Sequence, residues 1–301
     1  MEKKNNFKII NKSKNKQLFE KYKYKIEECV NDVLRINPDW RFVADIIVEA
    51  PYTTTNFVNQ ETHAGYLEIK PKKFIVRIST DSLRRIEFDG GLDLAITIHH
   101  EMAHAFDYYM ASTSKFCPTN LQKNHKKYLG EFVLMQGWKF WTEFFAYYQT
   151  FKVFYNKRNY PTIMQIVKGY EKLQEEYQIM KPYLENKPKA ARLQAHKFID
   201  DIKSFIYAFV IHLAGSIAGK GKYYQYCEKT MQQKNFQDVI KIRNKLYKKI
   251  QPLFINPYGK GFFKKIFRLG DELITSIYFK FGIEPIKHKG YAAFAFFVDK
   301  Q

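Results

Sequence analysis

The first third of the chain changes from one hydrophobic pattern to another. Residues 17–34 place apolar side chains at helical spacing among charged ones, and the sequence NPDW then ends the predicted helix. Residues 41–80 instead form short segments rich in Val, Ile, Thr and aromatic residues, separated by Pro, Asn and Gly: RFVADIIVEA, TTTNFVN, AGYLEIK and FIVRIST. This pattern predicts three or four strands of one small, mainly antiparallel sheet, joined mostly by hairpins.

The rest of the chain has the periodicity of helices. After the sequence FDGG, the residues Leu94, Ile98, Met102 and Ala105 recur at helical spacing and predict a helix over about 92–110. Beyond the loop STSKFCPTN, helices are predicted over about 121–136, 137–155, 162–183 and 190–218, followed by shorter pieces up to the C-terminus. The predicted fold class is therefore α+β, a small sheet followed by a mostly α-helical C-terminal lobe.

Composition narrows the protein class without deciding the function. The chain has 301 residues, 46% of them hydrophobic, which is typical of a globular protein with a large core. Its net charge of +20 is large and raises the question of a nucleic acid or an anionic surface as partner. Lys greatly outnumbers Arg, the basic residues are spread over the whole length, and no nucleic-acid-binding motif is present. Nucleic-acid binding therefore has no support beyond the net charge.

The cysteines and the apolar segments bear on the cellular compartment. Cys29, Cys117 and Cys227 are odd in number and contain no CxxC pair, which argues against a disulfide framework and for a reducing compartment. The N-terminus lacks the apolar run of a signal peptide, and residues 204–219 are too few for a membrane span and include a histidine. We expect a cytoplasmic protein with no membrane span.

The sequence LAITIHHEMAHAF places ionisable residues inside an apolar helix. His100 and His104 are four residues apart, so both imidazoles lie on one face, and Glu101 lies beside them. This is the H-E-x-x-H arrangement, in which two neutral imidazoles hold zinc and the glutamate acts on a zinc-bound water. The flanking residues are uncharged, as a buried metal-bearing helix requires.

The segment TIHHEMAHAF resembles the extended signature of the zincin metallopeptidases. The resemblance implies one Zn²⁺ per chain, with Glu101 as general base in the hydrolysis of a peptide or protein substrate. It also implies that the substrate lies along an edge strand beside the active helix, for which residues 74–80 are the candidate. The metzincin subclass is excluded, because Asp107 and Met110 stand where it needs glycine and histidine.

A catalytic zinc ion needs a third protein ligand. Glu143, the only acid in the aromatic segment GWKFWTEFFAYYQT, is the first candidate, because a lone carboxylate there is costly to bury without a metal or a cation. WTEFFA also resembles the segment that carries the third ligand in gluzincin-like families. Glu131 and Asp107 are the competing ligands. For Asp107, one turn beyond His104, the preferred role is to orient a ligand imidazole, with a cap or an ion-pair partner as the alternative.

Three ranges are expected along the chain. Residues 1–16 are predicted to be a flexible basic tail, residues 17–115 an α/β subdomain with the sheet and the H-E-x-x-H helix, and residues 116–301 a helical subdomain. The helical subdomain would supply the third metal ligand and the other wall of the cleft.

The oxyanion of a peptide-hydrolysis transition state needs a second electrophile besides zinc. His212 is the first candidate for this catalytic role, and Tyr207, His196, Tyr147 and Tyr148 are alternatives. His99 points about 100° around the helix from His100 and is interpreted as a packing or hydrogen-bonding residue.

Three other functions compete with a peptidase. The chain could be a basic, DNA-associated protein with a zincin domain, or a non-catalytic zincin-like interaction module, although the presence of Glu101 weakens the latter. The motif specifies water activation and not the acyl group, so amide hydrolysis on a small molecule fits it as well.

Overall fold

The computed structural model describes most of the chain. The described residues are 7–40, 43–50, 53–55, 60–62, 65–70, 73–118, 129–157, 160–186, 191–219, 228–288 and 291–296. The chain divides into two compact units. Unit 1 comprises Met1–Met110 and Lys152–Phe154, and unit 2 comprises Ala111–Phe151 and Tyr155–Gln301. The fold class is α+β, with a small sheet and a majority of helices.

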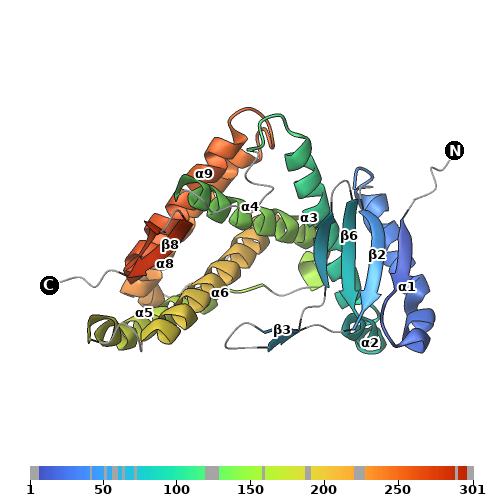
Figure 1. Ribbon diagram of the computed structural model, residues 1–301, viewed down its shortest axis with the longest axis horizontal. Helices are drawn as coiled ribbons and strands as arrows, with labels where there is room; N and C mark the ends of the chain where they lie inside the picture. The colour runs from blue at the N-terminus through green and yellow to red at the C-terminus, as the bar shows by residue number, and fades with distance from the viewer. Residues whose placement is uncertain are drawn as a thin grey trace. The chain divides into compact units, whose positions relative to one another are not determined.

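Unit 1 contains a four-stranded mixed sheet (Figure 1). Its strand order is β1 (Lys8–Asn11), β2 (Val43–Glu49), β6 (Lys73–Ser79) and β5 (Gly65–Lys70). The pairs β1–β2 and β2–β6 are parallel, and only β5–β6 is antiparallel. The prediction of a mainly antiparallel sheet is wrong, because long connections, not hairpins, lead from β1 to β2 and from β2 to β6.

Two strand assignments also differ from the sequence-based expectation. Strand β1 lies in the segment expected to be a flexible tail. Strands β3 (Thr53–Thr55) and β4 (Gln60–Thr62) form a separate antiparallel pair. The expected edge strand, residues 74–80, is wrong as an edge, because β6 is hydrogen-bonded on both sides and has no free backbone edge. The edge on that side of the described sheet is β5.

Three helices accompany this sheet. Helix α1 (Lys16–Ile36) buries its apolar face, as its periodicity predicts, and α3 (Leu92–Thr113) matches the predicted helix. Helix α2 (Thr80–Asp89) was not predicted, although its termini carry strong signals. The hydroxyl of Ser79 accepts from the amide of Asp81 over 3.1 Å, and Gly90 ends the helix with a φ of 65°.

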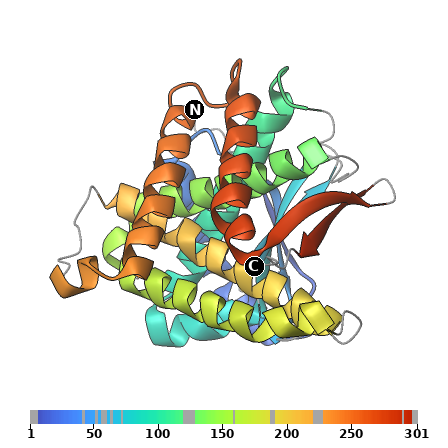
Figure 2. The same ribbon diagram turned by 90° about the vertical axis from the view of Figure 1, so that its left-hand side faces the viewer.

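Unit 2 is mainly helical (Figure 2). Its longer helices are α4 (Leu129–Phe154), α5 (Ile163–Asn186), α6 (Ala191–Ala218), α8 (Lys234–Ile250) and α9 (Phe262–Leu273). Shorter helical segments are η1 (Tyr155–Lys157), α7 (Glu228–Met231), η2 (Gln251–Leu253), the π-helix η3 (Ile274–Tyr278) and η4 (Phe279–Phe281). The described chain ends in a hairpin of β7 (Ile283–His288) and β8 (Tyr291–Phe296). The expectation of helices up to the C-terminus is therefore wrong, because Gly282, with a φ of 62°, ends the last helical segment.

Helix α4 runs without a break through Gly137, where two separate helices were expected. A Cβ at Gly137 would lie 2.0 Å from the carbonyl oxygen of Ile266, and one at Gly270 would lie 1.9 Å from that of Val133. Gly137 and Gly270 thus mark the close crossing of α4 and α9. The glycine serves helix packing and not chain reversal.

Helix α6 contains the one segment of the described chain, Gln194–Ala218, that is long and apolar enough to span a membrane. Half of its most apolar window is buried inside the structure. A single helix of this length and composition is weak evidence for a membrane span, because the core helix of a soluble protein has the same features.

Candidate metal centre

Helix α3 buries polar and apolar side chains together. Its apolar positions Leu94, Ile98, Met102 and Ala105 are all buried. Its polar residues are buried as well: His99, His100, Glu101, His104 and Asp107. Because a buried polar group is costly without a partner, the side chains of α3 need specific partners.

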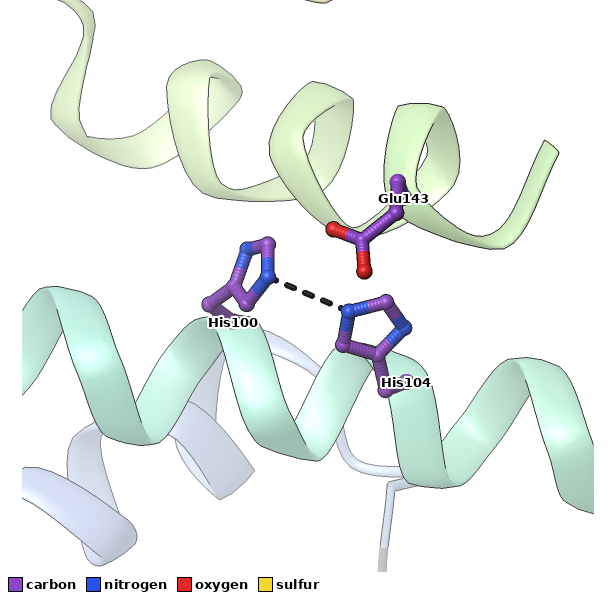
Figure 3. A group of neighbouring side chains, drawn as sticks. All are labelled: His100, His104 and Glu143. Atoms are coloured by element: carbon purple, nitrogen blue, oxygen red, sulfur yellow. Dashed lines mark hydrogen bonds between the residues drawn. The ribbon is translucent and has the colours of Figure 1, made fainter. Parts of the chain in front are cut away.

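The imidazoles of His100 and His104 face each other. One helical turn separates the two residues, and their Nε2 atoms lie 3.1 Å apart (Figure 3). The ring planes are nearly perpendicular, at 88°, with ring centroids 4.7 Å apart. Two nitrogen lone pairs can therefore be directed into the same small volume.

Glu143 completes a group of three candidate ligands. Its carboxylate extends from α4 toward the two imidazoles (Figure 3). One ligand atom from each of His100, His104 and Glu143 lies within 4.8 Å of the others. The sequence-based grouping of these residues is confirmed as a group close enough to bind a metal ion.

The donor set suits a divalent transition metal. In a tetrahedral zinc site with metal–ligand distances of about 2.0–2.1 Å, two ligand atoms lie about 3.3 Å apart. The Nε2 separation of 3.1 Å is close to this value. Two imidazoles and one carboxylate also match a catalytic site that keeps a position open. The residues therefore fit zinc, although the donor set alone leaves the metal's identity open.

The competing ligands lie elsewhere. Glu131 belongs to the first turn of α4, twelve residues before Glu143, so about 18 Å of helix axis separates the two. Glu131 is not a member of the three-residue group. Asp107 is completely buried on α3, one turn beyond His104, and its role in orienting an imidazole stays a prediction.

His99 is a packing residue, as expected. Its ring lies edge-on to Trp40, with centroids 5.0 Å apart, and to Phe154, at 5.7 Å. Its Nε2 atom lies 3.4 Å from the side-chain nitrogen of Asn37. Burial, assisted by the charge of Lys152, lowers the pKa of His99 to about 4, so the ring is neutral at physiological pH.

His212, the sequence-based candidate for oxyanion stabilisation, is buried in unit 2 and is not a member of the metal group. Its Nδ1 atom lies 2.8 Å from the carbonyl oxygen of Pro161, and the guanidinium of Arg243 donates to its Nε2 atom over 3.4 Å. Burial lowers the pKa of His212 to about 4. These contacts describe a neutral ring with a partner for each nitrogen, and the catalytic role of His212 stays a prediction.

Two of the alternative electrophiles form a pair that sequence reasoning did not foresee. The hydroxyls of Tyr147 on α4 and Tyr207 on α6 are hydrogen-bonded to each other. Tyr147 follows Glu143 by one helical turn and is buried, whereas Tyr207 is exposed. His196 is exposed on α6, and Tyr148 stacks on Phe144. Of these alternatives, Tyr147 shares the face of α4 that carries Glu143.

Comparison with known proteins returned no match. No protein-family model, no curated protein and no solved structure matches the chain. The functional argument therefore depends on the geometry of the chain's own residues.

Proposed function

We propose that the protein is a zinc-dependent metallopeptidase. The observation that carries the proposal is the group of His100, His104 and Glu143, with Glu101 next to the first ligand on the same buried helix. Two imidazoles and a carboxylate would hold Zn²⁺ with one position open. When bound there, zinc would lower the pKa of a water molecule toward 7 and polarise a carbonyl group.

Glu101 is the proposed general base. Its carboxylate would take a proton from the attacking water and later give it to the leaving amine, so that the peptide bond is replaced by a carboxylate and an amine. The burial of Glu101 would strengthen its electrostatic interactions, because charges interact more strongly away from bulk water. Such a general base contributes about 10²–10⁴-fold to the rate.

The edge strand β5 is the proposed strand for an extended peptide substrate. A Cβ at Gly65, the first residue of β5, would lie 2.7 Å from the Cγ2 atom of Thr97, so the start of the strand touches α3. Thr97 precedes Glu101 by four residues and lies on the same face of the helix. A peptide added to β5 would therefore run past the helical turn that carries the base.

Metal analysis tests the proposal first. Mass-spectrometric elemental analysis of the purified protein should find about one zinc per chain. Glu143→Ala should lose most of the zinc, and Glu131→Ala, the matched control on the same helix, should keep it. Absence of metal after zinc is supplied and the excess is removed would contradict the proposal, as would equal retention by both variants.

The catalytic part has its own test. Cleavage of a fluorescence-quenched peptide library should be detectable with the parent protein and should fall about 10²–10⁴-fold in Glu101→Gln. This variant should still bind zinc, because Glu101 is not among the proposed ligands. A zinc-loaded protein without hydrolysis of peptides in any sequence context would favour a metal-binding module over a peptidase.

A further inference from the structure

Apart from the candidate metal centre, one surface of unit 2 is unusual, and it lies where two loops meet. The first loop, residues 251–261, joins α8 to α9, and the second, residues 114–118, follows α3. The hydroxyl of Ser114 donates to the carbonyl oxygen of Tyr258 over 2.6 Å, so the loops are in contact. Figures 1 and 2 show them side by side. These two loops are called the tip below.

The tip exposes large apolar side chains. Ile255 is 81% exposed, Phe116 is 40% exposed and Phe254 is 36% exposed. Isolated exposed apolar residues are common, but here three lie on two loops that are in contact, and a concentration of exposed apolar residues is typical of interaction sites.

The loop from α8 to α9 is held in place from beneath. Leu253 and Tyr258 are buried, and the amine of Lys265 donates to the carbonyl oxygen of Pro252 over 3.0 Å. Phe254 lies edge-on to Trp141 and Phe144 of α4, at centroid distances of 5.5 and 5.8 Å. Ile255 is therefore presented to solvent by a supported loop.

Positive charge surrounds this apolar patch. From Val239 to Gly270 the chain contains nine Lys and Arg residues and no Asp or Glu. Lys248, Lys260 and Lys264 are exposed near the ends of α8 and α9 that face the loop. Within the part of the chain that the structure describes, none of these three lysines forms an ion pair with a carboxylate, whereas Lys241 and Lys245, farther from the loop, do.

We propose that the tip docks the protein onto an anionic membrane surface, with Ile255, Phe254 and Phe116 entering the interface and the surrounding lysines contacting the lipid headgroups. Apolar side chains framed by lysines are the chemistry of interfacial anchors, which combine burial of apolar area with attraction to anionic lipids. The proposal does not depend on the metal centre.

Charge and side-chain chemistry favour a membrane over two other partners, a second copy of the chain and a nucleic acid. A second copy of the chain would bring the same positive charges to the interface and be repelled. A nucleic acid would satisfy the lysines but offers little to an exposed aliphatic side chain, since base recognition uses arginine and aromatic stacking. Ile255, the most exposed side chain of the tip, therefore favours a lipid surface.

Vesicle sedimentation with the full chain tests the proposal. The protein should bind vesicles of phosphatidylcholine with about one third phosphatidylserine much more tightly than vesicles of phosphatidylcholine alone. Ile255→Ser should weaken binding to the mixed vesicles about tenfold. Ile179→Ser, which changes an isoleucine that is 68% exposed on α5, is the matched control and should bind as the parent does.

The charge contribution has its own matched pair. Changing Lys248, Lys260 and Lys264 to Gln should weaken binding on the order of a hundredfold. Changing Lys168, Lys197 and Lys203 on α5 and α6 to Gln removes the same net charge away from the tip and should have little effect.

Three outcomes would overturn the proposal. Equal binding to neutral and mixed vesicles would show that anionic lipid is not recognised. Equal binding by Ile255→Ser and Ile179→Ser would show that Ile255 does not anchor the protein in the membrane. Retention on duplex DNA that is lost in the lysine variant of the tip but kept in Ile255→Ser, without vesicle binding, would assign the surface to nucleic acid instead.

Discussion

Helix α3 and the tip depart from the usual distribution of side chains in opposite directions. Helix α3 buries His100, His104 and Glu101 among aliphatic residues. The tip exposes Ile255 and Phe254 among lysines. The first arrangement costs desolvation of polar groups, and the second leaves apolar area in water. Neither is expected of a protein optimised only for stability, so each indicates a binding role.

The comparison also shows why composition alone is a poor guide. The net charge of +20 is a sum over the chain, but the charge relevant to the tip is its local excess around residues 239–270. In the same way, the 30 acidic residues give no hint that Glu143 is placed among aromatic side chains. In both regions the residues around each side chain indicate a function that the whole-chain composition does not.

The largest expected effect is stabilisation of the fold by zinc, which should depend on Glu143 and not on the tip. Saturating zinc should stabilise metal-depleted protein by about 4 kcal/mol at 1,000 times the dissociation constant, because zinc binds the folded state. Thermal unfolding with and without zinc measures this. Glu143→Ala should lose most of the stabilisation and Ile255→Ser should keep it. A zinc effect of equal size in Glu143→Ala would place the metal elsewhere in the protein.

A smaller effect tests the close crossing of α4, the helix that carries Glu143, with α9, the helix that follows the tip. Gly137→Ala would force a methyl group against the backbone of α9 and should lower the free energy of unfolding by about 2–3 kcal/mol. Gly130→Ala, on the same helix with its Cβ 3.9 Å from Phe267, should be neutral or stabilise by about 0.5–1 kcal/mol. Urea denaturation measures both. Equal effects would contradict the close crossing.

Local patterns in the sequence predicted much of this architecture. The periodicity of α1, α3 and α6 predicted those helices to within a few residues. The pairing of His100 and His104 followed from helical geometry, because residues four apart necessarily share a face. The grouping of Glu143 with them was predicted from a lone acid among aromatic residues and from the resemblance of WTEFFA to the third-ligand segment of gluzincin-like families.

Features that depend on distant contacts were not predictable. Strand β1 is four residues long in a Lys- and Asn-rich segment, and only its pairing with β2 defines it as a strand. A glycine such as Gly137 can end a helix or allow a second helix to pack closely against it, and the sequence looks the same in both cases. Only the contact with α9 shows that Gly137 has the second role. The contacts of His212 with Pro161 and Arg243 join residues 51 and 31 positions apart.

The smallest effect is a difference in unfolding free energy between two neighbours in the tip, the packed Phe254 and the exposed Ile255. Phe254→Ala should lower the free energy of unfolding by about 1–2 kcal/mol, because the ring packs on Trp141, Phe144 and Tyr148 while part of it is exposed. Ile255→Ala, one residue along, should change it by less than about 0.5 kcal/mol, because this side chain is mostly in water. Urea denaturation of the two variants measures the difference. If Ile255→Ala destabilised the fold as much as Phe254→Ala, Ile255 would have a structural role in the loop, and its exposure would no longer indicate a surface kept for a partner.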